Sequence, residues 1–228
     1  MRKNTVVISL GGSLVNPGKP DFSYINKISR LLETLDYSFG VVVGGGRLAR
    51  QYAERERKKG KGEFEADLAA IKATKINANL LIKSLKRQAY SKVCSTFDEA
   101  KRASKKYKIV VMGGTIPGIT TDADAALLAE CLHARRLVNI SNIDGIYDRN
   151  PSKFHDARKY RYMKFEELLL LSNKEDLRLA GGHFVFDILG CKIIARSKIE
   201  THFVSGKNLS DVSKAIQGKR HNGTIVSS

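Results

Sequence analysis

Three glycine-rich turns, each preceded by a run of β-branched residues, constrain the fold of this chain most strongly. They occur in VVISLGGSL (6–14), VVVGGGRLAR (41–50) and IVVMGGTIPGITTDADAA (109–126). A strand that ends in glycines and leads into a helix exposes backbone N–H groups at the positive end of that helix, and glycine lets a ligand approach the backbone closely. The three turns together predict a site built around phosphate groups.

Between the turns, strand-like runs alternate with helix-like segments. Strands are expected at 5–10, 40–43, 109–112, 136–140 and 200–204. Helices are expected at 22–35, 47–58, 64–85, 97–105, 122–132, 165–171, 186–196 and 208–216, and a polar loop at 150–161. The apolar faces include Phe22 in the helix over 22–35 and Leu68 in the helix over 64–85. Alternation of this kind favours an α/β fold, a three-layer α/β/α sandwich with a mostly parallel central sheet. Its ligand should lie beyond the carboxyl ends of the strands, where the glycine turns are.

The length and composition are those of one globular domain over residues 1–228. No apolar run approaches the roughly 18 residues that span a bilayer. The N-terminus enters a strand without a signal-peptide pattern, which favours a cytoplasmic protein. Cys94, Cys131 and Cys191 are scattered and form no CxxC pair, so we expect reduced thiols rather than disulfides or a zinc site.

The chain is strongly basic, with a formal net charge of +17 at pH 7. Positive potential favours anionic ligands such as nucleotides, and it would also suit a nucleic-acid surface. The lysines and arginines are spread over many segments, and no aromatic-interleaved RNA motif accompanies them. The charge therefore favours a nucleotide over a nucleic acid as the partner.

Two familiar nucleotide motifs are absent. No G-x-G-x-x-G follows a predicted strand, which disfavours a dinucleotide-binding dehydrogenase. The stretch 113–120 has the glycine spacing of a P-loop, but Ile119 stands where a P-loop needs lysine. The five histidines are isolated, so no protein-held metal ion is predicted.

The ordered set LGGS, VVVGGGRLAR, MGGTIPGITTDADAALLAE, NISNIDGIYDRNP, FDILGCKIIARS and HNGT resembles the amino acid kinase superfamily and, within it, the archaeal-type uridylate kinases. The resemblance runs from Val6 to Thr224. It implies transfer of the γ-phosphoryl group of ATP to UMP, with Mg²⁺ accompanying ATP, in a homo-oligomer that is a hexamer. A phosphate oxygen of UMP is already ionised at neutral pH, so positioning and charge neutralisation suffice without a general base.

The resemblance also implies the site residues, with UMP bound mainly by the first half of the chain and ATP mainly by the second. Expected to bind ATP are Ser9, Gly11, Gly12, Ser13, Gly46, Arg50, Ser141, Asn142, Tyr147 and Asn150. Expected to bind UMP are Gly45, Asp67, Gly114, Thr115, Ile116, Pro117, Gly118, Ile119 and Thr120. Expected catalytic residues are Arg50, Asp122, Asp187 and Lys192. Arginine suits phosphate because its planar fork donates two hydrogen bonds, and a carboxylate such as Asp67 suits the ribose hydroxyls.

Several of these residues also have an ordinary structural interpretation. Asp122 can cap a helix. The negative charge of Asp67 can simply be favoured by the dipole at the start of a helix. Arg50 can be a solvated cation like Arg47. Asp124 is interpreted only as an acid in the first turn of its helix.

Two positions depart from the family pattern. Ser9 stands where many superfamily members carry lysine, so Lys192, Arg50 or Mg²⁺ has to neutralise the transferred group. Asn150 stands where the family commonly has Asp, which predicts weaker ATP binding. We also expect a mobile loop around Gly181, Gly182 and His183.

Two other functions remain open at this point. Isopentenyl phosphate kinases share several turns, but they follow the GGG turn with a histidine-containing segment, whereas this chain has RLAR, and Asp67 favours a sugar. A non-catalytic protein that binds a nucleotide or another oxyanion would need no turnover at all.

Overall fold

The computed structural model describes residues 4–176 and 186–228, and the expected loop at Gly181, Gly182 and His183 lies outside them. The strands are β1 (Thr5–Leu10), β2 (Ser38–Val43), β3 (Ala89–Cys94), β4 (Ile109–Met112), β5 (Arg136–Ser141), β6 (Tyr162–Lys164), β7 (Glu200–Ser205) and β8 (Thr224–Ser227). They form one sheet in the order β3-β4-β2-β1-β5-β7-β8-β6. Each neighbouring pair is parallel except β7 with β8.

The helices connect these strands and cover both faces of the sheet. They are α1 (Gly12–Val15), α2 (Phe22–Thr34), α3 (Gly46–Lys58), α4 (Glu63–Ser84), α5 (Phe97–Ser104), α6 (Thr121–Cys131), α7 (Phe165–Asp176), α8 (Ile188–Arg196) and α9 (Leu209–Gln217). Two local hydrogen bonds fix the start of α5. The Thr96 hydroxyl accepts the N–H of Glu99, and the Glu99 carboxylate accepts the N–H of Ser95.

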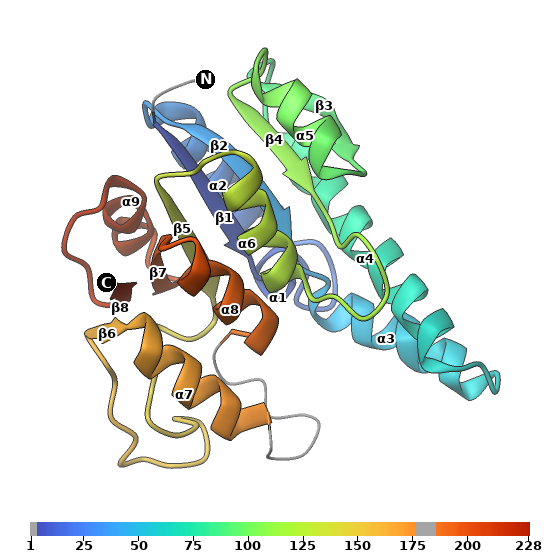
Figure 1. Cartoon of the computed structure of the whole chain (residues 1–228). Coiled ribbons are helices and arrows are strands. Elements are labelled where there is room, and N and C mark those ends of the chain that lie inside the picture. Colours follow the sequence, from blue (N-terminus) through green and yellow to red (C-terminus); the bar gives the residue numbers. More distant parts are fainter. Residues whose placement is uncertain (1–3, 177–185) are drawn as a thin grey trace.

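Two hydrophobic cores lie on opposite faces of the sheet. Side chains alternate along a strand, so Val7 faces one core while Val6 and Ile8 face the other. Helices α5, α6, α7 and α8 pack on the first face, and α2, α4 and α9 pack on the second (Figure 1). The expected three-layer α/β/α sandwich with a mostly parallel sheet is confirmed.

Strands β3, β6 and β8 were not expected from the sequence. The middle of β3, at Ser91 and Lys92, is exposed, since β3 is an edge strand and lacks the continuous apolar run of the central strands. The other two strands have only three and four residues. Within the described residues, no helix combines the length and the apolar character needed to cross a membrane.

Two residues placed on apolar helix faces are exposed instead. Phe22 is 61% exposed at the first position of α2, ahead of the buried Ile25 and Ile28. Leu68 is 40% exposed. With 22 residues, α4 is about 33 Å long at 1.5 Å per residue, while a six-residue strand such as β1 spans about 20 Å. The first turns of α4, which include Leu68, therefore extend past the sheet beside α3 (Figure 1).

Candidate active site

Four neighbouring strands end at the same edge of the sheet, in the order β4-β2-β1-β5. The three glycine turns follow β4, β2 and β1, and β5 ends at Ser141. The chain continues from β1 to β2 on one side, while β5 pairs with β1 on the other. The sheet order thus reverses beside β1, the position at which open α/β sheets form a ligand crevice. The segments predicted to bind phosphate lie at this edge or on the helices that begin there.

The first two glycine turns pack directly against each other through their backbones. A Cβ atom at Gly12 would lie 2.1 Å from the carbonyl oxygen of Gly44, so no larger residue fits there. Gly46 has φ +57° and a Cβ atom on it would lie 2.5 Å from the amide nitrogen of Ser13. The N–H of Gly44 donates to Leu10 O at 2.8 Å. The two turns form one continuous backbone surface, and it needs glycine.

Helix α4 holds the second and third glycine turns in place through two buried polar side chains. The Asn77 amide donates to the carbonyl oxygens of Gly44 and Gly45 at 3.0 and 3.2 Å. The Thr74 hydroxyl accepts the N–H of Gly114 at 2.7 Å. Neither side chain was predicted as part of the site. The one available signal is a pair of polar residues three apart on a helix face that otherwise buries apolar ones.

The loop over 114–120, predicted to bind UMP, is held by carboxylates from distant parts of the chain. The N–H of Gly118 donates to Asp67 Oδ2 at 2.8 Å, which joins two residues predicted for the acceptor. The hydroxyl of Thr120 donates to Asp187, the residue that caps the start of α8. The acceptor loop is therefore tied both to α4 and to a helix from the second half of the chain.

A third carboxylate, Asp124, fixes the other end of this loop. It accepts the N–H of Thr115 at 3.1 Å and the Thr115 hydroxyl at 2.6 Å. Asp124 is fully buried, so its interpretation as only a first-turn acid was wrong. Burial raises the pKa of Asp124 to about 6, the bonds from Thr115 oppose the rise, and Asp187 adds to it.

The side chains of the 114–120 loop point to different surroundings. Ile116 and Gly118 are exposed, and a Cβ atom at Gly118 would meet nothing within 4 Å. Ile119 packs against the hydrophobic core on the α6 side of the sheet, and Pro117 is half-buried. The tip of the loop thus presents backbone to the surroundings, while Ile119 anchors it.

Asp122 lies in the first turn of α6 and is held by two strands of the sheet. Ser9 on β1 and Asn139 on β5 donate to the same oxygen, Asp122 Oδ1, at 2.8 and 3.1 Å. Burial raises the pKa of Asp122 to about 7, the bond from Ser9 opposes the rise, and the nearby Asp187 adds to it. Asp122 and Asp187, two of the predicted catalytic residues, are therefore close enough to interact.

The predicted ATP residues gather on the β5 side of this sheet edge. The Gly11 N–H donates to Ile140 O at 2.8 Å, which ties the first turn to β5. The Asn142 amide donates to the Ser13 hydroxyl at 2.9 Å, across 129 positions of the chain. The Ser141 hydroxyl accepts the N–H of Ile143 at 3.1 Å. The sequence placed these residues in one site, and the fold brings them together.

Two further residues predicted for ATP lie in the loop that follows. The Tyr147 hydroxyl donates to Asp144 at 2.6 Å. The Asn150 side-chain oxygen accepts the N–H and the hydroxyl of Ser152 at 2.9 and 2.6 Å. That oxygen is engaged in a local turn, so only its amide group is left to donate to a ligand.

The two predicted catalytic cations stand apart from the carboxylates. Arg50 on α3 and Lys192 on α8 have exposed side chains. Across 4–176 and 186–228 neither forms a hydrogen bond or ion pair with another residue. Both lie on helices that begin at this edge of the sheet, so both side chains are free to meet an anionic ligand. In the same ranges, no group of three His, Cys, Asp or Glu side chains is placed to hold a metal ion.

Comparison with known proteins matches the sequence and the fold of this chain to one family. The model of the amino acid kinase family matches residues 4–205. Uridylate kinases from Pyrococcus abyssi and Methanocaldococcus jannaschii are 42% and 41% identical to this chain, each over 97% of this chain and 98% of the relative. The crystal structure of uridylate kinase from Archaeoglobus fulgidus is similar with a TM-score of 0.87 and 39% identity, over 97% of this chain and 99% of that one. The UMP kinase structure from Bacillus anthracis, 17% identical with a TM-score of 0.81 over 98% of this chain and 96% of that one, shares the fold.

Proposed function

Because the chain belongs to the amino acid kinase family, and its sequence and fold both match uridylate kinases, we propose that it transfers the γ-phosphoryl group of ATP to UMP. The products are ADP and UDP. In the transfer, a phosphate oxygen of UMP forms the new bond to the γ-phosphorus as the bond to the leaving oxygen of ADP breaks. The incoming oxygen is already ionised, so no residue has to act as a general base.

The observation that carries this proposal is that two consecutive glycines, Gly45 and Gly46, pack against different parts of the site. A Cβ atom at Gly45 would lie 2.2 Å from the Cβ of Ala49 on α3 and 3.2 Å from the methyl group of Thr74, the residue whose hydroxyl holds the acceptor loop at Gly114. A Cβ atom at Gly46 would lie 2.5 Å from the amide of Ser13, which belongs to the donor side. The second glycine turn therefore separates an acceptor side from a donor side, which supports Gly45 for UMP and Gly46 for ATP.

The residues proposed around UMP suit a nucleotide. Asp67 uses one carboxylate oxygen for Gly118, which leaves the other to accept from ribose hydroxyls. A carboxylate in this position disfavours the apolar tail of an isopentenyl phosphate, because that tail offers no hydrogen-bond donor to the half-buried Asp67. The 114–120 loop supplies backbone groups around the base and phosphate.

The residues proposed around ATP supply positive charge and backbone donors. The start of α3 at Gly46 points N–H groups and a helix dipole at the crevice. Arg50 sits one turn further along α3 and would donate two parallel hydrogen bonds to phosphate oxygens. Because Ser9 is bonded to Asp122 and is not a lysine, Arg50 and Lys192 are the cations we assign to the transferred group.

Mg²⁺ is proposed to accompany ATP, and the residues present fit that role. In the described ranges, both oxygens of Asp187 accept hydrogen bonds, whereas Asp122 accepts both of its bonds on Oδ1. Asp122 would therefore hold Mg²⁺ together with ATP phosphates, in keeping with the preference of Mg²⁺ for one or two carboxylates plus phosphate oxygens. The metal would neutralise charge on the phosphates. We also propose that the chain forms one domain, assembles into a hexamer and acts in the cytoplasm.

The proposal is tested by incubating the chain with UMP and ATP that carries a radioactive γ-phosphate. We expect the label to move into UDP, and the Arg50→Ala variant to move it much more slowly. Label that stays in ATP or appears only as inorganic phosphate, despite binding of both nucleotides, would contradict a UMP kinase.

A further inference from the structure

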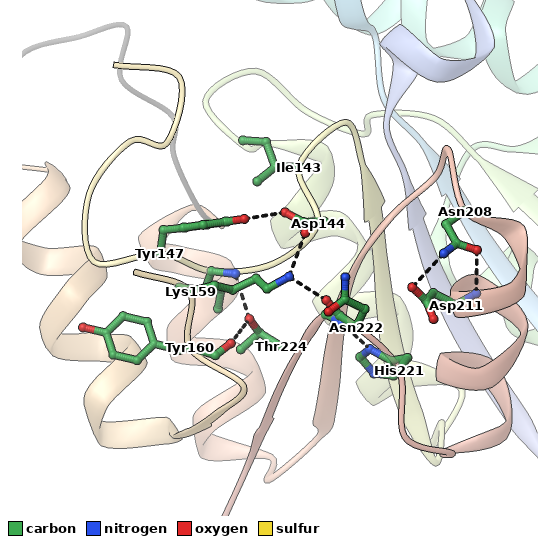
Figure 2. Close-up of polar contacts among 12 residues, drawn as sticks. Ile143, Asp144, Tyr147, Lys159, Tyr160, Asn208, Asp211, His221, Asn222 and Thr224 are labelled. Atoms are coloured by element: carbon green, nitrogen blue, oxygen red, sulfur yellow. Dashed lines mark hydrogen bonds and ion pairs between the residues drawn. The ribbon is translucent and has the colours of Figure 1, made fainter. Parts of the chain in front are cut away.

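The segment HNGT (221–224) near the C-terminus has no role in the proposed reaction, yet it contacts the loop over 143–160. This donor loop, as we call residues 143–160, connects β5 to β6 and includes Tyr147 and Asn150, both proposed for ATP. We infer that Thr224 is a positioning residue that fixes the donor loop for ATP (Figure 2). The inference rests on the proposed function, since it takes this loop to be the ATP side of the site.

The Thr224 hydroxyl ties both arms of the donor loop together. It accepts the N–H of Ile146 at 2.8 Å and donates to the carbonyl oxygen of Tyr160. Thr224 is fully buried. Gly145 has φ +153°, and a Cβ atom on it would lie 2.8 Å from the Thr224 hydroxyl, so glycine lets the loop come this close. The two arms also bond to each other directly, because the N–H of Tyr160 donates to Ile146 O at 2.9 Å and the N–H of Asp148 donates to Arg158 O at 3.0 Å. The Thr224 hydroxyl adds a bond to each arm and thereby fixes the paired arms to the C-terminal segment.

A second connection runs from the same segment to Tyr147. The carbonyl oxygen of Asn222 accepts from Lys159 Nζ at 2.8 Å, and Lys159 also pairs with Asp144 at 2.7 Å. The other oxygen of Asp144 accepts the Tyr147 hydroxyl at 2.6 Å (Figure 2). Burial favours the neutral acid, but the bonds from Lys159 and Tyr147 outweigh it and lower the pKa of Asp144 below its ordinary value. The Asp144 carboxylate is therefore charged at neutral pH and holds the tyrosine.

The HNGT segment is itself anchored to the sheet, so it can act as a fixed support. His221 Nε2 lies 2.8 Å from His202 Nδ1 on β7, and the N–H of Gly223 donates to His221 Nδ1 at 2.9 Å. A Cβ atom at Gly223 would lie 2.0 Å from Phe203 O. The buried sheet thus supports one side of the segment, and the donor loop rests on the other.

This arrangement predicts an effect on ATP that is separate from an effect on UMP. The contacts of Thr224 reach the donor loop, whereas the 114–120 loop is held by Asp67, Asp124 and Asp187. A loosened donor loop has to be ordered again when ATP binds, which weakens ATP binding. A residue that served only overall stability would affect both substrates equally.

The test compares Thr224→Val, which keeps the shape but loses both hydrogen bonds, with Thr224→Ser, which keeps the hydroxyl. The matched control is Thr201→Val, because Thr201 is also fully buried and its hydroxyl, among the residues that the structure describes, bonds only to Ile199 O. We expect Thr224→Val to raise KM for ATP about tenfold while KM for UMP stays within about twofold. Thr224→Ser should restore the ATP value and Thr201→Val should leave it unchanged. Equal changes in both KM values, or none, would overturn the inference.

A second variant covers the case in which Thr224→Val does not fold. Lys159→Met keeps the straight side chain but removes the bonds to Asp144 and Asn222, and it should raise KM for ATP in the same selective way. Affinity for a non-hydrolysable ATP analogue separates this inference from the proposed function. If the natural chain binds the analogue but does not phosphorylate UMP, the proposed function is contradicted. Weaker binding of the analogue by Thr224→Val would still support the positioning role of Thr224. Unchanged analogue affinity in both variants would overturn that role.

Discussion

Ser9 on β1 and Asn139 on β5 are register partners in the sheet, and they donate to the same oxygen of Asp122. Both donors are neutral groups, so neither bond brings a positive charge to the carboxylate. This explains why burial and the nearby Asp187 raise the pKa of Asp122 to about 7 in spite of the bond from Ser9. The site we assign to the triphosphate therefore contains an acid that titrates near neutral pH.

The first prediction concerns stability as a function of pH. Because the folded pKa of Asp122 lies above the unfolded value of 3.8, the folded chain holds the extra proton between these values. The stability from the neutral acid is present below pH 4 and is lost as the pH rises through 7. The Asp122→Asn variant should therefore gain stability over the natural chain as the pH rises from 5 to 8, by up to a few kcal/mol.

This gain is measured by guanidinium unfolding of both proteins at several pH values between 5 and 8. The difference in the free energy of unfolding should grow with pH and level off above 7. A difference that stays constant over this range would show that Asp122 is ionised throughout.

The second prediction concerns the cation assigned to the phosphates. Replacing Arg50 by Ala should lower kcat/KM by about 100-fold or more, because a charged, bidentate contact to phosphate is lost. Arg47→Ala is the control, since Arg47 is exposed on the same helix and its guanidinium lies beside Gly18. Steady-state kinetics with both substrates checks this, and a loss below about threefold for Arg50→Ala would remove it from the site.

The third prediction concerns the acceptor side. Asp67→Asn should raise KM for UMP about tenfold or more and leave KM for ATP nearly unchanged, because a charged acceptor for the ribose hydroxyls is lost. Glu65→Gln serves as the control, being an exposed acid in the first turn of α4, two residues before Asp67. Equal changes for UMP and ATP would place Asp67 outside the acceptor site.

The fourth prediction concerns the buried histidine pair. Burial and the neighbouring His202 lower the pKa of His221 to about 4. Its neutral form accepts the N–H of Gly223 on Nδ1, which directs its Nε2–H toward His202. The charged and titratable groups that face the pair are Glu200, Arg136, Asp211, Lys214 and Lys159.

Because the folded pKa of His221 lies below the unfolded value of 6.5, the stability from its neutral form is present above pH 6.5 and is lost as the pH falls toward 4. His221→Asn removes this titration, so the stability advantage of the natural chain over the variant should shrink between pH 7 and 4.5. Urea unfolding of both proteins across this range provides the measurement. An advantage that does not change with pH would mean that His221 titrates alike in the folded and unfolded states.

Local patterns predicted the central strands and the glycine turns, because a buried parallel strand has a continuous apolar run and a tight turn needs glycine. The roles of Thr74 and Asn77 could not be predicted in this way. Their partners, Gly114 and Gly44, lie 40 and 33 positions away, and only the packing of α4 on the sheet brings them together. Asp124 shows the same limit, since its burial depends on the fold of the 114–120 loop, in which Thr115 bonds to it.

The measurement that tests the central claim most directly is ADP release from Mg-ATP with different acceptors. The panel contains UMP, CMP, dUMP, isopentenyl phosphate and a reaction without acceptor. We predict ADP formation that depends on UMP and is absent with isopentenyl phosphate or without acceptor. Release that depends on isopentenyl phosphate, or no release with any acceptor despite ATP binding, would contradict a UMP kinase.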